Sequence, residues 1–193
     1  LLVGEGWVDP PSMLAALLLI RSHVAYRGAC GHALSGAAAE TYPLVRSCLE
    51  YAGYALLIHG TPEKGEVWVS RHDDEAALQA VRSNFSVGKV QAAIAAANAD
   101  KARAYKTLYD RSIDFGAHPN IHGLASNMKI IEKGKDRIVQ IVYLHTDGVQ
   151  MQSSLKTTAQ AGVCALEIFQ EAFPERFQEM GVTDTLARVR QHL

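Results

Sequence analysis

The spacing of hydrophobic residues along this 193-residue chain changes once, and that change constrains the fold most. Through about residue 120, and again from Leu155, apolar residues recur at intervals of three and four, the period of an amphipathic helix. Between these stretches, residues 124–131 follow the two-residue period of a strand, and residues 137–145 are rich in β-branched side chains. Gly134 lies between them and can take a positive φ, so we predict a β-hairpin with a five-residue loop.

The order of helices, hairpin and helices predicts a mainly α-helical protein. We expect an up-and-down helical bundle with a β-hairpin insertion near residues 123–146. The length fits one helical domain, residues 1–193, with the hairpin as its appendage. Helices are expected at residues 9–29, 34–59, around Trp68, at 73–85, 86–115, 155–173 and 183–192.

Local signals fix several of these boundaries. Asp9 and Pro10 are typical of a helix start, since Asp caps the first turn and Pro needs no N–H there. Gly28 weakens the end of this first helix, and Pro43 predicts a kink or a fresh start in the second. Gly60, followed by Thr61 and Pro62, predicts a stop and a restart. The alanine-rich stretch after Ser86 is expected to run directly into the next helix.

Composition excludes several classes of protein. Hydrophobic residues make up 48% and charged residues 20%, which rules out wholesale disorder. The net charge of -1 gives no basic excess typical of a nucleic-acid binder. The longest apolar run, residues 13–20, is too short for a membrane span and lacks the flanks of a signal peptide. Three cysteines without a C-x-x-C pattern indicate buried thiols in a reducing cytoplasm. We therefore predict a cytoplasmic protein with no membrane association and, because phosphate-loop and dinucleotide fingerprints are absent, no cofactor.

Eight histidines are more than a chain of this size usually carries, and three of them flank the predicted junction of bundle and hairpin. On a continuous helix Asp114 and His118 share a face. With His122 and His145 they form one hypothesis, a metal or small-ligand site of mixed nitrogen and oxygen donors. The alternative is structural: His118 caps the helix C-terminus and bonds Asp114. Pro119 interrupts the spacing of His118 and His122, which counts against the metal site.

A second hypothesis starts from Arg111 and His118, which have the form R-x6-H, and from Arg27 and His32, which have the form R-x4-H. With a polar Ser112 after the arginine, the chain resembles the HEPN superfamily of small, often dimeric helical bundles. The resemblance implies a metal-independent ribonuclease of toxin or phage-defence type. In it Arg111 would hold the scissile phosphate, and His118 would act as general acid or base on the 2′-OH attack. An RNA partner receives no support from the net charge.

A looser likeness joins this chain to uncharacterised bacterial helical families. They combine an R-x-x-x-E helix, here Arg46 to Glu50, with a later tyrosine-rich helix that ends in His-Pro, and they bring no assigned activity. Arg46 and Glu50 are four residues apart on a partly apolar stripe, so we interpret them as an internal ion pair, with a catalytic carboxylate as the alternative.

No activity can be assigned on these grounds alone. The leading expectation is a helical-bundle protein that forms a homo-oligomer, as a homodimer, because the apolar fraction is high and a hairpin leaves unpaired strand edges. The ribonuclease using Arg111 and His118 and the module around Asp114, His118, His122 and His145 remain open beside it.

Overall fold

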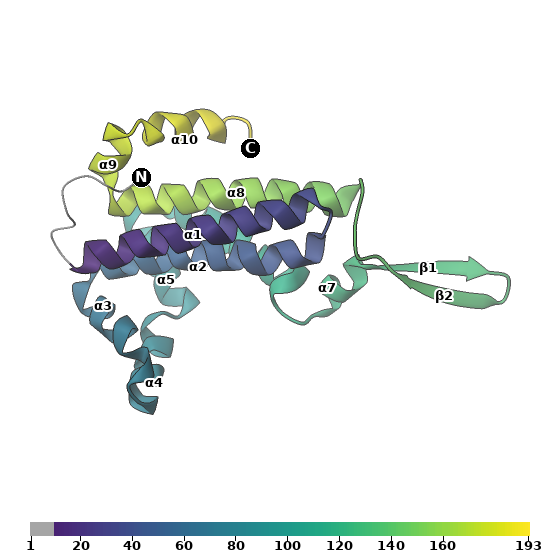
Figure 1. Cartoon of the computed structure of the whole chain (residues 1–193), viewed down its shortest axis with the longest axis horizontal. Coiled ribbons are helices and arrows are strands. Elements are labelled where there is room, and N and C mark those ends of the chain that lie inside the picture. The colour runs from purple at the N-terminus through teal and green to yellow at the C-terminus, as the bar shows by residue number, and fades with distance from the viewer. Residues whose placement is uncertain (1–9) are drawn as a thin grey trace.

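The computed structural model describes residues 10–193 and has ten α-helices and a two-stranded antiparallel hairpin in that part of the chain (Figure 1). The helices are α1 (Pro10–Leu34), α2 (Ala38–Gly60), α3 (Pro62–Val69), α4 (Glu75–Asn84), α5 (Val87–Ala97), α6 (Ala99–Ser112), α7 (Ile121–Ser126), α8 (Val149–Ala172), α9 (Pro174–Glu179) and α10 (Val182–Arg190). The strands are β1 (Met128–Lys133) and β2 (Asp136–Ile141), and short turns η1 (Ser70–His72) and η2 (Ile113–Ala117) follow α3 and α6. The prediction of a mainly α-helical bundle with a hairpin near residues 123–146 is confirmed.

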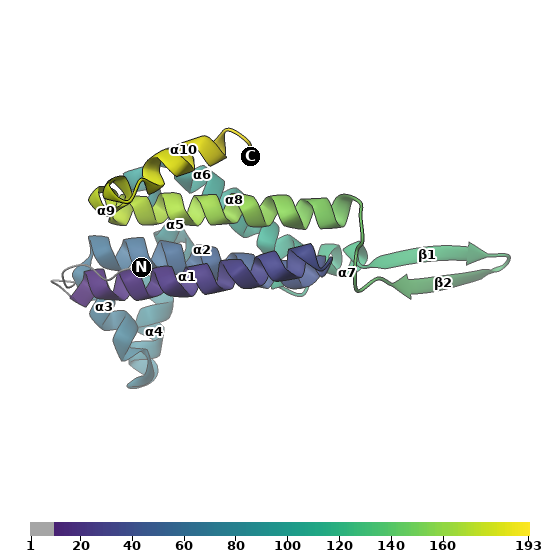
Figure 2. The same cartoon turned by 45° about the horizontal axis from the view of Figure 1, so that its top comes forward.

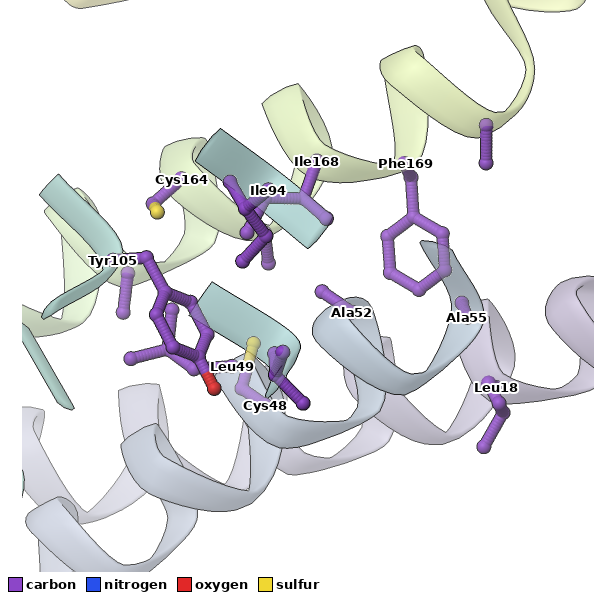
Figure 3. Packing of buried hydrophobic residues seen from close by; sticks show 14 of the residues in the cluster. Leu18, Cys48, Leu49, Ala52, Ala55, Ile94, Tyr105, Cys164, Ile168 and Phe169 are labelled. Carbon is purple, nitrogen blue, oxygen red and sulfur yellow. The ribbon is translucent and has the colours of Figure 1, made fainter. Parts of the chain in front are cut away.

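The three longest helices, α1, α2 and α8, lie side by side and form the body of the bundle (Figure 1). Figure 3 shows the core between α2 and α8, where Leu49, Ile168 and Phe169 are completely buried. Small residues let the helices approach closely. A Cβ placed on Gly162 of α8 would lie 2.4 Å from the ring of Tyr26 in α1, so only glycine fits at that crossing.

Helix α1 extends five residues past the predicted end near Ala29, so that boundary was wrong. Ala29 and Ala33 are both completely buried against the bundle, and this packing outweighs the weak helix propensity of the glycines. The chain then turns at Gly36, which has a φ of 82°. The capping role expected of Asp9 lies outside the described residues.

Pro43 does not break α2, contrary to the predicted kink or fresh start, because it falls in the second turn of one continuous helix. A proline at that position provides no N–H for the carbonyl of Ala39. The backbone of Gly116 packs against that carbonyl: a Cβ on Gly116 would lie 2.3 Å from the Ala39 oxygen. The turn η2 is therefore docked where Pro43 leaves a carbonyl without an intrahelical partner.

The sequence pattern predicted that the alanine-rich stretch runs directly into the next helix, and this prediction was wrong. Asn98 is extended between α5 and α6, and its side-chain oxygen accepts from the backbone N–H of Asp100 at 3.0 Å and of Lys101 at 3.1 Å. These bonds cap α6 and offset the interruption. The stop at Gly60, the helix around Trp68 and the start of α4 after Asp74 are confirmed.

The hairpin projects from one end of the bundle, as Figure 1 and the turned view in Figure 2 both show. Its strands pair from Met128 with Ile141 to Lys133 with Asp136. The loop is therefore two residues, Gly134 and Lys135, rather than the predicted five, and Gly134 takes the positive φ of 66°. Residues 129–141 are all exposed.

No helix in the described part of the chain is long and apolar enough to cross a membrane.

Candidate functional site

His145 lies where the hairpin returns to the bundle and is nearly buried, with 9% of its surface exposed. Its backbone N–H donates to the carbonyl of Gly36 at 2.8 Å, and its ring Nε2 is hydrogen-bonded to the Asn127 side-chain oxygen at 3.1 Å. A Cβ on Gly36 would lie 2.1 Å from the His145 carbonyl oxygen, so the α1–α2 turn fits tightly on this segment. His145 thus anchors the base of the hairpin.

Asp114, His118 and His122 do not join His145 in a ligand set. All three are exposed, and residues 10–193 hold no group of three or more side chains placed to bind a metal ion. The reason is the path of the backbone. Helix α6 ends at Ser112, the π-helical turn η2 follows, and His118 is already extended with a φ of -146°. Nothing in this arrangement supports the metal hypothesis.

The expectation that Asp114 and His118 share a continuous helical face is therefore wrong. His118 does follow the last residue of η2, as a C-terminal residue should. The bonds that close this turn come from Asn120 instead, whose side-chain amide donates to the carbonyls of Ile113 at 2.7 Å and His118 at 2.9 Å. A residue that the sequence pattern treated as a loop position holds the turn together.

Arg111, the other half of the R-x6-H pattern, points toward α8. Its Nη1 donates to the Thr157 hydroxyl and to the Gln160 side-chain oxygen, both at 3.2 Å. It lines a cavity of about 410 Å³ between α6, α8 and α10, and His118 is not among the lining residues. Arg103 and Arg190 line the same cavity. The structure thus groups Arg111 with two arginines rather than with the predicted histidine.

The ion pair interpretation of Arg46 and Glu50 is confirmed, with 2.8 Å between Nε and Oε1. Tyr109 completes the group: its hydroxyl donates to the same Glu50 oxygen at 3.0 Å, and the Arg46 guanidinium lies 5.3 Å from its ring centre. Burial, followed by the negative charge of Glu50, raises the pKa of Tyr109 to about 12. Burial alone would lower the pKa of Arg46, but its hydrogen bond to Glu50 reverses that effect, and the pKa is raised. The positive charge of Arg46 and the negative charge of Glu50 thus balance each other within the bundle.

A second cavity, also of about 410 Å³, lies between α1, α8 and α10 and is almost entirely apolar. Its few polar neighbours include Ser22, whose hydroxyl donates to the Cys48 carbonyl at 2.9 Å. Val163 of α8 and Leu193 line both cavities, so the two adjoin one another. Helix α10 contributes Leu186, its one fully buried residue, to the apolar cavity and Arg190 to the cavity beside Arg111.

Comparisons of this chain with protein-family models, with curated proteins and with solved structures find no significant match.

Proposed function

We propose that this protein acts as a self-associating helical bundle, a homodimer in which the hairpin of each copy packs on the other copy. One observation carries the proposal: the hairpin has large apolar side chains on both faces, and none is covered. Ile130 and Val139 are a cross-strand pair on one face, 66% and 54% exposed. Ile131 and Ile138 are a pair on the other face, 45% and 46% exposed.

An isolated two-stranded ribbon is marginal in water, because it lacks a hydrophobic layer to pack on. This hairpin extends away from its own bundle in both views (Figures 1 and 2), so the bundle does not supply that layer. Its outer strand edges are also unpaired, and such edges favour association with another chain. A covering surface from a second molecule satisfies both needs.

More large apolar side chains are exposed at the end of the bundle from which the hairpin projects (Figure 1). Large apolar side chains are exposed there on the last residue of α1, on α7, in the segment after β2 and at the start of α8. We call them the end surface: Leu34, Ile121, Leu124, Tyr143, Leu144 and Val149. Large exposed apolar patches mark interaction sites in soluble proteins.

A second copy is the occupant that fits this surface best. A two-fold dimer uses the same patch on both molecules, so the hairpin of one copy meets the end surface of the other and the contact is made twice. A stable interface takes roughly 800 Å² from each partner. The two hairpin pairs and the end surface hold ten large apolar side chains, each 45–76% exposed, and these are the area that we expect each copy to contribute.

The test is the mass of the protein in solution over a range of concentrations, by sedimentation or light scattering. We expect the unaltered protein to be a dimer and the double variant I130S/V139S to be a monomer. The matched control is L17S/I20S, which changes two side chains of similar exposure, 50% and 49%, on the free face of α1. It should remain a dimer.

A monomeric mass for the unaltered protein would overturn the proposal. Dissociation of the L17S/I20S control with retention of the dimer in I130S/V139S would overturn it too, because the interface would then be the free face of α1. Circular dichroism of each variant separates dissociation from loss of the fold.

The ribonuclease hypothesis stays a prediction: the hydrogen-bond partners of Arg111 favour it, and the position of His118 counts against it. Within residues 10–193 the partners of Arg111 are neutral, which leaves it available to a phosphate, whereas His118 lies outside the Arg111 cavity. Incubation with a single-stranded RNA, with H118A as the variant and H122A as the control, tests it. Cleavage that is lost in H118A alone would support it, and cleavage that is unchanged or absent would remove it.

A further inference from the structure

The cavity beside Arg111 has an unusual set of charges for a chain with a net charge of -1. Arg103 and Arg111 lie eight residues apart on one face of α6, with Thr107 between them. Arg190 reaches the cavity from α10, on the opposite wall. Three guanidinium groups from two helices thus line one cavity of about 410 Å³, a volume within the usual range of small-molecule sites.

Arg111 has no acidic partner among the ion pairs of the described residues. Its two hydrogen bonds, at 3.2 Å, go to the neutral oxygens of Thr157 and Gln160. Thr157 is completely buried, which fixes the guanidinium at the cavity wall. A half-buried guanidinium held by neutral oxygens has no carboxylate beside it and has several N–H donors left for a ligand.

The other two arginines are held by carboxylates that do not remove this excess. Arg190 pairs with Glu167 at 3.1 Å, and Glu167 is the one acidic side chain that lines the cavity. Arg103 pairs with Asp100 one turn earlier on its own helix, where both side chains are largely exposed. Pairs as exposed as this last one exchange readily with solvent and with other anions. The lining therefore has more positive than negative charge.

The rest of the wall is apolar. Ala104, Leu108, Val163 and Cys164 line the cavity together with the arginines. The thiol of Cys164 is neutral, since burial raises its pKa to about 12. A ligand that fits must therefore present an oxyanion to the arginines and a compact apolar body to these side chains.

We infer that this cavity binds a small organic oxyanion, a phosphate ester or a carboxylate with a compact apolar group. Guanidinium groups bind both kinds of oxyanion through paired N–H donors. The oxyanion accepts from Arg111 and Arg103, and the apolar group replaces water on Leu108 and Val163. The inference is independent of self-association, because none of these residues lies in the hairpin or on the end surface.

The experiment is a calorimetric or NMR titration of the full chain with phenyl phosphate, benzoate and inorganic phosphate. We expect phenyl phosphate or benzoate to bind and inorganic phosphate to bind at least tenfold more weakly, because it lacks the apolar group. R111Q should weaken binding by about tenfold or more, as loss of a charged hydrogen-bond donor does. R103Q tests the same site at a position exposed enough to leave the fold intact.

The matched control is R188Q, on the same helix as Arg190 but away from the cavity lining. It should bind the probes as the unaltered protein does. The inference is overturned if neither organic probe binds, or if R111Q and R103Q both bind the probes as tightly as the unaltered protein does. Equal weakening by R188Q would mean that net charge rather than the cavity attracts the anion, and binding of a single-stranded RNA without binding of the small probes would assign the arginines to a polymer instead.

Discussion

The bundle core and the hairpin are built from the same kinds of side chain, yet the two regions treat them differently. Ile94 and Ile168 in the bundle are completely buried, whereas Ile130 and Ile138 in the hairpin are 66% and 46% exposed. The buried apolar side chains of the bundle pack against neighbouring helices, so packing within the chain supplies the stabilisation there, although α1 also has an exposed apolar stripe at Met13, Leu17, Ile20 and Val24. The hairpin contributes apolar surface that its own chain does not use. If the protein associates as proposed, the difference means that its stability depends on the bundle core and its association on the hairpin.

The largest effect should come from shortening the same residue type in each region. I168A removes buried methyl and methylene groups from the core and should lower the free energy of unfolding by about 3 kcal/mol. I130A, in the hairpin, should change it by less than about 0.5 kcal/mol when the protein is dilute enough to be monomeric. Urea titration measured by circular dichroism checks both. Equal losses would mean that the hairpin packs on its own bundle.

A glycine pair tests how tightly the bundle itself is packed. In G162A the new Cβ would lie 2.4 Å from the Tyr26 ring, and such overpacking should cost about 1–3 kcal/mol. In G31A the new Cβ meets nothing within 4 Å apart from its own stretch of helix, so the better helix propensity of alanine should raise the free energy of unfolding by about 0.5 kcal/mol. Thermal unfolding of the two variants gives the comparison. A neutral G162A would show that α1 and α8 separate easily at this crossing.

The sequence predicted correctly those helix ends and turns that depend on interactions between neighbouring residues. The stops at Gly60 and before Pro174, and the turn at Gly134, depend on backbone properties of single residues, and all three lie where the sequence placed them. Pro43 and Ala29 were misjudged because tertiary contacts decide them: the backbone of Gly116 covers the carbonyl that Pro43 leaves open, and complete burial holds Ala29 in its helix.

The candidate sites were harder to predict for the same reason. Arg46 and Glu50 are four residues apart, so their pairing could be read from helical spacing. Tyr109, which donates to Glu50, is 59 residues away, and Thr157, which accepts from Arg111, is 46 residues away. Helical spacing predicts contacts between residues three or four apart, so it cannot predict contacts between residues this far apart in the sequence. The spacing of Asp114 and His118 misled because η2 interrupts the regular helix between them.

Alkaline pH should destabilise the bundle through its buried thiols. Burial raises the pKa of Cys48 to about 11 and of Cys164 to about 12, above the ordinary value of 9.0. The folded form therefore retains protons that the unfolded form loses, so stability is fully present below pH 9 and falls as the pH rises toward 12. Because each thiol ionises in the unfolded form, each should lower the free energy of unfolding by about 1 kcal/mol at pH 10. Urea midpoints between pH 7 and 10.5 check this.

The hairpin has no cysteine, so the alkaline loss should be the same in the I130S/V139S variant as in the unaltered protein. Thiol ionisation followed by absorbance near 240 nm identifies the titrating groups. A urea midpoint that does not change up to pH 10.5 would contradict the burial of these thiols.

The smallest effect is expected from one charge substitution made in both regions. E50Q weakens a half-buried pair and a hydrogen bond from Tyr109, and should lower stability by about 1 kcal/mol. E132Q removes the hairpin partner of Arg137, at 3.7 Å with both side chains more than 70% exposed, and should leave the unfolding midpoint of the monomer unchanged. The two measurements are made at low and high protein concentration. A second copy that covers the hairpin would partly exclude water from Glu132 and Arg137, so the pair would then contribute to stability. A concentration-dependent effect of E132Q, with none for E50Q, would therefore place the hairpin inside the interface.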